Sequence, residues 1–450
     1  MIDFKTFSKS LLAEGERVLK EDILPYVDKQ TELFKDKWLV NRIRLGVTGL
    51  SGSGKTTFIT SLIYHLLRDA ALSVSFEPDF PKDGKRFRYE ENIACFKKNV
   101  PEWPPSTVDK SEICLKINDG RNDLYLEIVD YPGEWLLDLP LLEQSFWEWS
   151  QTVKEYLSCT GNRLPDWAVS AKKLADKGCS DNENVLEIAD QYRLWLHDLK
   201  NKGFEYLQPG RFVMPDTKSD IYTLVNFFPW VWDDEQKNEN ALFKKLEERY
   251  NRYKIEKVEP FYRHFKNLNK QIVLVDCLRS LQKGVTAWND LKFTLGELLK
   301  NFSYGRRNGF VARLLNSFKI DQVLFVATKA DYVSYEEKRI EALTGILKSA
   351  VAEAAEKTFL QKADVAYRSV AAVSVQKINK SDDAACYYFP NGKQGVELPE
   401  MLTQARINEF KEKCSEFDGI PPLSPLRMNE NGDLPNIEMF NVIKFILGEN

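Results

Sequence analysis

The stretch RLGVTGLSGSGKTTFITSLI, from Arg44 to Ile63, constrains the fold more than any other segment of this chain. An apolar strand leads into a glycine-rich turn and then an amphipathic helix, and Gly49 to Thr56 matches the pattern GxxxxGK[ST] in full. Glycines let the backbone curl so that its N–H groups point at phosphate oxygens, and the helix N-terminus adds its dipole. The motif could occur by chance, but a chance match would rarely have a strand before it and a helix after it. The segment therefore predicts a phosphate-binding loop.

Individual residues of this loop have distinct predicted roles. Lys55 supplies a cation to the β- and γ-phosphates and is a predicted catalytic residue, and the Thr56 hydroxyl is placed to ligate Mg²⁺. The loop residues predicted to bind the nucleotide are Ser51, Gly52, Ser53, Gly54, Lys55, Thr56 and Thr57.

A second motif, VDYPG, follows an apolar strand. Asp130 ends this strand, three residues before Gly133. A carboxylate there can hold Mg²⁺ through water, while the Gly133 N–H can meet a γ-phosphate. The DxxG pattern by itself is common, and its position after the phosphate-binding helix is what favours a role in the site.

The segment 71–110 is rich in Pro, Lys and aromatic residues and is predicted to be an irregular loop that folds over the phosphates. Thr107 would complete the Mg²⁺ shell only when a γ-phosphate is present, which makes it a predicted metal ligand, nucleotide contact and catalytic switch residue. The adjacent Ser106 is an alternative nucleotide contact, and a threonine after Pro-Pro can also be a turn residue. Trp103 has two possible roles: it shields the ribose or base of the nucleotide, or it only packs against neighbouring residues.

A third motif predicts which base is bound. Asp331, in Thr328-Lys329-Ala330-Asp331, follows an apolar strand and can accept hydrogen bonds from N1–H and the N2 amine of guanine. Adenine offers neither donor and would leave a buried carboxylate unpaired. The Lys329 stem can lie across the purine face. A strand predicted at 370–376 places the backbone N–H groups of Ser374 and Val375 near the guanine oxygen. These features predict GTP or GDP as the bound nucleotide.

Composition excludes several other classes. The net charge of −4 indicates no nucleic-acid partner, and seven cysteines without CxxC spacing argue against a zinc site or a disulfide framework. Three histidines leave little room for histidine-based catalysis. The absence of an uncharged apolar run of membrane-spanning length, with acidic residues near the N-terminus, predicts a cytoplasmic protein without a membrane span or secretory signal.

Continuous apolar strands alternating with helices predict an α/β fold with a mostly parallel sheet, apart from an antiparallel hairpin of 112–119 and 123–130. A long helical stretch interrupts this alternation. Its aromatic run FFPWVW, 227–232, is either a partner-binding patch or the core of a helical subdomain. The predicted divisions are an N-terminal helical segment 1–41, a nucleotide-binding domain in the two parts 42–134 and 270–376, a helical insertion 135–269, a loop-rich insertion 377–433 and a final helix 434–450.

The ordered motifs resemble those of the Ras-like GTPases, and the chain more closely resembles the bacterial YcjX-like family. The resemblance rests on GLSGSGKTTFITSLI, WPPST, LYLEIVDYPGEWLLDLPLL, QIVLVDCLRSLQKG and VLFVATKADYV. It implies a P-loop GTPase core with a helical insertion, a role in the bacterial stress response, and a membrane protein as a partner that would bring the chain to the inner membrane.

Two residues depart from the usual GTPase pattern. Thr328 stands where asparagine is commoner, which should weaken the contact between this loop and the phosphate-binding loop. Glu134 stands where many relatives carry the glutamine that orients the attacking water. As a catalytic residue it would place negative charge near the γ-phosphate, which predicts slow hydrolysis. The alternative is a solvated acid at a helix start.

Three functions remain after this reading. The first is a GTP-dependent switch with slow Mg²⁺-dependent hydrolysis. The second is a P-loop ATPase or a small-molecule kinase, for which the guanine motif would be superfluous. The third is an interaction protein that holds a nucleotide without turnover. Arg86, Arg88 and Arg279 are candidates for the cation that stabilises the transition state, and surface positions are the alternative for each.

Overall fold

The computed structural model describes residues 41–50, 52–82, 84–105, 109–120, 122–160, 164–214, 224–233, 239–265, 267–302, 322–332, 337–355, 364–378, 385–388, 394–395, 423–429 and 431–448. The predicted N-terminal helical segment and most of the predicted loop-rich insertion therefore lie outside the described residues, as do Ser51, Ser106 and Thr107.

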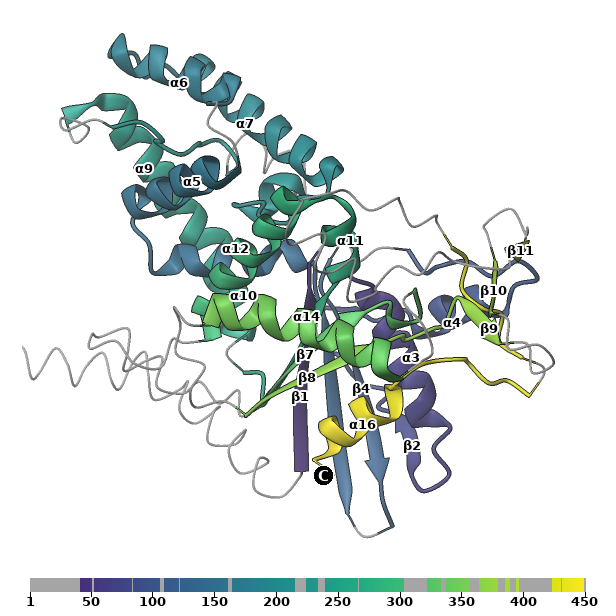
Figure 1. The fold of residues 1–450 in the computed structure, drawn as a ribbon. Helices are drawn as coiled ribbons and strands as arrows, with labels where there is room; N and C mark the ends of the chain where they lie inside the picture. The colour runs from purple at the N-terminus through teal and green to yellow at the C-terminus, as the bar shows by residue number, and fades with distance from the viewer. Residues whose placement is uncertain are drawn as a thin grey trace, which may run out of the picture.

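An eight-stranded mixed sheet forms the centre of the molecule (Figure 1). Its order is β2-β4-β5-β1-β6-β7-β8, with β3 paired to β4. The pairs β5–β1, β1–β6, β6–β7, β7–β8 and β3–β4 are parallel, whereas β2–β4 and β4–β5 are antiparallel. The strands are β1 Asn41–Gly49, β2 Ser73–Phe76, β3 Lys85–Arg86, β4 Ser111–Asn118, β5 Asp123–Asp130, β6 Lys270–Val275, β7 Gln322–Thr328 and β8 Asp364–Val370. The predicted α/β fold, mostly parallel sheet and hairpin are confirmed.

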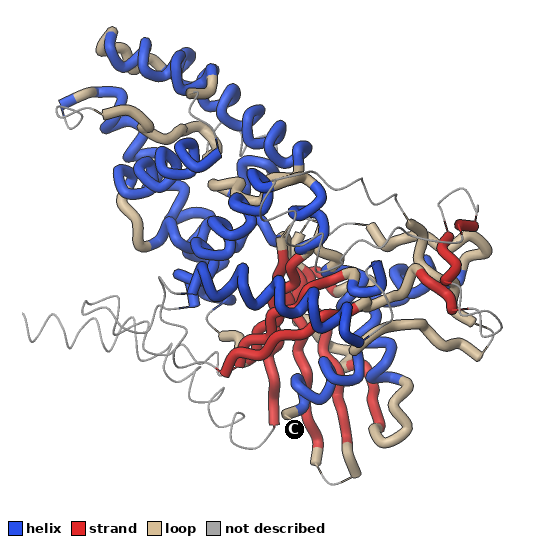
Figure 2. The backbone as a smooth tube through the Cα atoms, viewed as in Figure 1, coloured by secondary structure: helices blue, strands red, loops and turns tan. Residues whose placement is uncertain are grey.

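Helices cover both faces of the sheet (Figure 2). The central strands are apolar on both faces, so alternate side chains enter different cores: Ile272 and Leu274 enter one, Val273 and Val275 the other. The first core includes residues of α3 Lys55–Leu67, α4 Tyr89–Lys97 and α16 Met439–Leu447. The second includes residues of α11 Cys277–Gln282, α12 Val285–Phe302 and α14 Glu337–Ala355.

Between β5 and β6 the chain is largely helical, as predicted, and these helices stand over one end of the sheet (Figure 1). The aromatic run 227–232 is buried there, with Phe227, Phe228 and Trp230 fully enclosed. This supports the core interpretation over the exposed patch. The elements are the 3₁₀ helices η2 Gly133–Leu142 and η3 Gly210–Val213, the α-helices α5 Phe146–Thr160, α6 Asp166–Asp176, α7 Asn182–Lys202, α9 Ala241–Tyr253 and α10 Glu259–Phe265, and the π-helix η5 Lys254–Val258.

Two predictions about secondary structure are wrong. The segment 71–110 contains β2, β3 and α4. The residues of β2 alternate between exposed and half-buried, and both residues of β3 are exposed, so neither strand forms a continuous apolar run. The strand predicted at 370–376 lies earlier, at β8, whose charged residues Asp364 and Arg368 disguise it. The apolar residues after Val370 instead form a turn, and 376–378 enters a small separate sheet, β9 Gln376–Ile378, β10 Ala385–Tyr388 and β11 Gln394–Gly395.

Candidate nucleotide site

The glycine-rich loop joins the carboxyl end of β1 to the start of α3. Gly52 and Gly54 have φ of +75° and +83°, a left-handed conformation that favours glycine. The Lys55 Nζ donates to the Gly49 carbonyl at 2.9 Å. Burial lowers the pKa of Lys55, although Glu134 and Asp130 oppose this shift. The loop thus presents a half-buried lysine to the site.

The DxxG segment lies directly against this loop. A Cβ added to Gly133 would be 1.7 Å from the Gly49 carbonyl oxygen and 3.1 Å from Lys55 Nζ, so only glycine fits. Asp130 is buried at the end of β5, opposite Val47 in the parallel register with β1. The structure therefore brings together the two motifs, as their order in the sequence predicted.

The donor chemistry here suits Mg²⁺. Thr56 lines the cavity with a hydroxyl, and Asp130 offers a carboxylate at the end of the adjoining strand. Mg²⁺ prefers oxygen ligands and usually needs only one or two protein groups besides waters and substrate phosphates. Within the described ranges there is no group of three or more His, Cys, Asp or Glu side chains that could hold a metal. Thr107, the third predicted ligand, lies outside the described residues.

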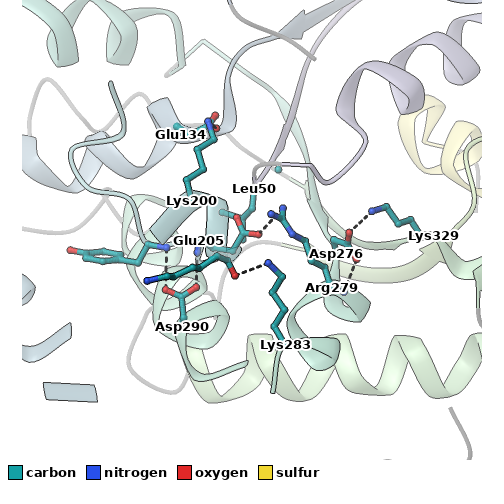
Figure 3. Close-up of polar contacts among 12 residues, drawn as sticks. Leu50, Glu134, Lys200, Glu205, Asp276, Arg279, Lys283, Asp290 and Lys329 are labelled. Atoms are coloured by element: carbon teal, nitrogen blue, oxygen red, sulfur yellow. Dashed lines mark hydrogen bonds and ion pairs between the residues drawn. The ribbon is translucent and has the colours of Figure 1, made fainter. Parts of the chain in front are cut away.

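The predicted base-binding motif, Thr328 to Asp331, begins at the last residue of β7. It lies at the same edge of the sheet as the carboxyl ends of β1 and β5. Asp331, in the short 3₁₀ helix η6 Ala330–Tyr332, is 1% exposed and accepts a hydrogen bond from the Val375 N–H at 2.6 Å. Burial raises the pKa of Asp331 to about 7. Lys329 has a left-handed φ of 61°, and its Nζ contacts Asp276 Oδ2 at 2.5 Å (Figure 3). Asp276 thus fixes the lysine predicted to cover the purine.

Thr328 is buried, and its Oγ1 makes no hydrogen bond to another residue in the part of the chain that the structure describes. The weakened contact to the phosphate-binding loop stays a prediction.

One cavity of about 560 Å³ connects the phosphate-binding loop to the base motif. This is within the usual range of about 300–1,000 Å³ for small-molecule sites. Its lining includes Gly52, Ser53, Gly54, Lys55, Thr56, Thr57, Phe58, Trp103, Pro104, Pro105, Glu134, Lys200, Met214, Thr328, Lys329, Asp331, Tyr332 and 370–373. Most of the predicted nucleotide-binding residues that the structure describes therefore line a single continuous space.

Ser374 and Val375 are placed differently from the prediction. The Ser374 N–H donates to the Pro435 carbonyl at 2.8 Å, and the Val375 N–H is held by Asp331. The part of this segment that lines the cavity is 370–373, because β8 ends earlier than predicted. A contact between the Val375 N–H and guanine would require that N–H to leave Asp331.

Trp103 lines the cavity and is also packed. Its Nε1 donates to the Leu423 carbonyl at 2.8 Å, and its ring meets Phe96 edge-on. Both roles considered from the sequence are thus compatible with its position.

Glu134 is not a solvated acid, and this alternative is wrong. It is 6% exposed, and its Oε1 accepts a hydrogen bond from Lys200 Nζ at 2.9 Å (Figure 3). Burial by itself would raise the pKa of Glu134, but Lys200 and Lys55 outweigh burial and lower the pKa below its usual value. An ionised carboxylate therefore stands beside the phosphate-binding lysine.

The three candidate arginines are in different surroundings. Arg86 and Arg88 are exposed, the first over the Phe76 ring and the second 3.6 Å from Glu91. Arg279 is close to the phosphate-binding loop, since a Cβ on Gly52 would be 2.9 Å from its Nη1. The same Nη1 atom of Arg279 lies 3.7 Å from Glu205 Oε1 (Figure 3).

Several residues in or next to the cavity were missed from the sequence. Asp276 directly follows β6, at the edge of the sheet that also carries Asp130 and Asp331, and this shared position could have indicated it. Lys200 comes from the helical insertion and has no local signature. Met214 and Tyr332 were also missed.

Comparison with known proteins agrees with this geometry. The profile of the YcjX-like family, DUF463, matches residues 43–450. The chain belongs to the YcjX-like family. The protein named Ras-like GTPase YcjX of Escherichia coli strain K12 is 32% identical to it, over 91% of this chain and 97% of that protein. The protein of the same name from Shewanella oneidensis is 33% identical, over 68% of this chain and 72% of its own length. No helix in the described part of this family member is long and apolar enough to cross a membrane.

Proposed function

We propose that this YcjX-like protein binds GTP and hydrolyses it slowly with Mg²⁺, as a nucleotide-controlled switch. The observation that carries the proposal is the continuous cavity, which has the phosphate-binding loop at one end and the buried Asp331 at the other. Curated relatives at 32–33% identity bear the name Ras-like GTPase, which supports the same reading.

In this proposal the loop N–H groups and Lys55 hold the β- and γ-phosphates, and the Asp331 carboxylate reads guanine. Thr56 and Asp130 would hold Mg²⁺, with Thr107 joining them when GTP is bound. Bound Mg²⁺ would neutralise charge on the β- and γ-phosphate oxygens. Glu134 orients the attacking water, and its negative charge keeps the rate low. Ser53, Gly54 and Gly133 complete the phosphate contacts.

The insertion is the proposed reader of nucleotide state, because its first element, η2, begins at Gly133. We further propose that the output belongs to the bacterial stress response, that the protein works in the cytoplasm, and that a protein partner at the inner membrane receives the signal. These last points rest on family resemblance.

The deciding experiment measures Mg²⁺-dependent binding of GTP, GDP and ATP, followed by phosphate release from the same samples. Lys55→Ala should abolish binding of all three nucleotides. Asp331→Asn replaces an acceptor with an amide that can donate to the C2 carbonyl of xanthine. This variant should therefore prefer XDP over GDP, whereas the unaltered protein prefers GDP.

The alternatives give different results. ATP binding that does not depend on Asp331 would favour the ATPase or kinase. Tight GDP or GTP binding with no phosphate release would favour the protein that holds a nucleotide without turnover.

A further inference from the structure

Lys200 reaches the phosphate end of the cavity from the helical insertion. It lies in the last turn of α7 and lines the same space as Lys55 and Glu134. Figure 3 shows its side chain directed at Glu134, and its Nζ donates to Glu134 Oε1 at 2.9 Å. An ammonium group has three donors, and this contact accounts for one of them. Lys200 is thus a second cation at the end of the cavity where Lys55 lies.

The backbone that carries Lys200 is held against the nucleotide-binding core. Gly203 ends α7 with a left-handed φ of +83°, and Lys283 Nζ donates to the Lys202 carbonyl at 2.6 Å. The next residues are fixed as well, because the N–H groups of Glu205 and Tyr206 donate to the buried Asp290 at 2.6 and 3.2 Å. Lys283 and Asp290 belong to the chain after β6 (Figure 3). The insertion therefore presents Lys200 from a fixed position.

The charges around the γ-phosphate position require such a cation. Phosphoryl transfer spreads negative charge over the γ-phosphate oxygens, and the ionised Glu134 beside them opposes it. Of the three arginines considered, Arg86 and Arg88 are exposed at the surface, and Arg279, although close to Gly52, is not among the residues that line the cavity. Lys200 is both next to Glu134 and on the cavity wall. It is therefore better placed than these arginines to offset this charge.

We propose that Lys200 is a catalytic cation that the helical insertion supplies to the γ-phosphate in cis, which rests on the GTP hydrolysis proposed above. In the GTP complex its ammonium donates to a γ-phosphate oxygen while still neutralising Glu134. Water oxygen forms the new bond to the γ-phosphorus, the bond from that phosphorus to the β–γ bridging oxygen breaks, and the water proton leaves with inorganic phosphate. Lys200 donates hydrogen bonds throughout and transfers no proton. After phosphate leaves, its remaining contact is with Glu134.

The test compares Lys200→Met with Lys202→Met. Methionine retains most of the stem and removes the charge, and Lys202 is an exposed lysine of the same helix end that pairs with Asp198. Single-turnover GTP hydrolysis should fall about 10²-fold in Lys200→Met, the usual loss when one preorganised donor is removed. Lys202→Met should hydrolyse GTP at the rate of the unaltered protein. GDP affinity should be unchanged in both variants, and Lys200→Arg should retain much of the rate.

Two further measurements separate a phosphate contact from simple neutralisation of Glu134. GDP with aluminium fluoride and Mg²⁺ mimics the transferring phosphoryl group, and it should bind to the unaltered protein and Lys202→Met but not to Lys200→Met. In a Glu134→Gln background no carboxylate needs neutralising, so adding Lys200→Met should still slow hydrolysis. Equal rates in Glu134→Gln with and without Lys200→Met would overturn the phosphate contact.

The outcomes distinguish this inference from the proposed function. If the unaltered protein hydrolyses GTP and Lys200→Met does so equally fast, the role of Lys200 is wrong and the GTPase proposal stands. If the unaltered protein neither binds nor hydrolyses GTP, both are wrong.

Discussion

A single buried carboxyl, Asp331, connects base recognition to pH. It is 1% exposed, and burial raises its pKa to about 7, so the nucleotide-free protein is partly protonated there at neutral pH. In the proposed complex, guanine donates two hydrogen bonds to the ionised form. The raised pKa also means that the folded state binds more protons than the unfolded state, so this group's contribution to stability falls as pH rises from the unfolded value near 3.8 to about 7.

We expect GDP affinity to rise with pH, because binding requires Asp331 to be ionised. Below a pKa of about 7 the affinity should fall about tenfold per pH unit, so binding at pH 8 should be about tenfold tighter than at pH 6. Calorimetry in buffers of different ionisation enthalpy would measure the proton released. Asp331→Asn corrects for titration of the GDP phosphates, and an equally steep pH profile in this variant would contradict the assignment.

Gly133 is the other residue whose local geometry makes a direct prediction. Gly133→Ala would place a methyl group 1.7 Å from the Gly49 carbonyl oxygen, so the DxxG segment must move away from the phosphate-binding loop. GTP affinity should fall at least tenfold, and GDP affinity less, because the displaced N–H is proposed to meet the γ-phosphate. Gly345→Ala is the matched control, since the same methyl group meets nothing within 4 Å there. Equal losses for both nucleotides would argue against the γ-phosphate contact.

At the scale of elements, later parts of the insertion hold residues 137–141 of its first element, η2. Gln208 Nε2 donates to the Leu137 carbonyl at 2.5 Å, and the Tyr250 hydroxyl donates to the Leu141 carbonyl at 3.1 Å. The Asp138 carboxylate, whose pKa burial raises to about 6, accepts from the Tyr253 hydroxyl at 2.7 Å. Since η2 starts at Gly133, we expect a movement of that residue to reach these partners.

Tyr253→Phe tests how much the hydrogen bond to Asp138 contributes to stability. The change removes a donor to buried Asp138, so the free energy of unfolding should fall by about 1–3 kcal/mol. Tyr64→Phe is the control, because the buried Tyr64 hydroxyl has no hydrogen-bond partner within the described residues. Urea denaturation of both variants would check the difference. A loss in Tyr64→Phe as large as in Tyr253→Phe would show that the Asp138 bond adds little.

At the scale of the whole molecule, the insertion and the sheet share one hydrophobic core. Trp149 and Phe227 of the insertion belong to the same buried cluster as Val273 and Phe325 of the sheet. The insertion is therefore not an appendage with a core of its own, and local opening of either part disturbs the other.

Nucleotide binding should accordingly stabilise both parts together. GDP at about 100 times its dissociation constant should stabilise the folded chain by about 2.7 kcal/mol. Hydrogen exchange in α5 and α9 should then slow by the same factor as in β6 and β7. Lys55→Ala, which should not bind GDP, supplies the control. Exchange in α5 and α9 that is indifferent to GDP would show that the insertion opens independently of the core.

The amino-acid sequence by itself determined what depends on local chemistry. The glycine-rich loop, the β4–β5 hairpin and the apolar central strands were predictable because each is a short pattern with a backbone cause: left-handed glycines, a tight turn and burial on both faces. Surface strands were not predictable in the same way. Charged and exposed residues hid β2, β3 and β8, and the early end of β8 moved the cavity wall to 370–373.

Only the tertiary structure decided which distant groups share the site. Glu134 and Lys200 are 66 positions apart, and Lys329 and Asp276 are 53 apart, so no periodicity or motif could pair them. Their positions depend on how the insertion docks on the sheet and on where parallel strands end. The sequence therefore predicted a phosphate-binding loop and a base-reading aspartate, and the packing of the insertion decided which cation from the insertion stands beside Glu134.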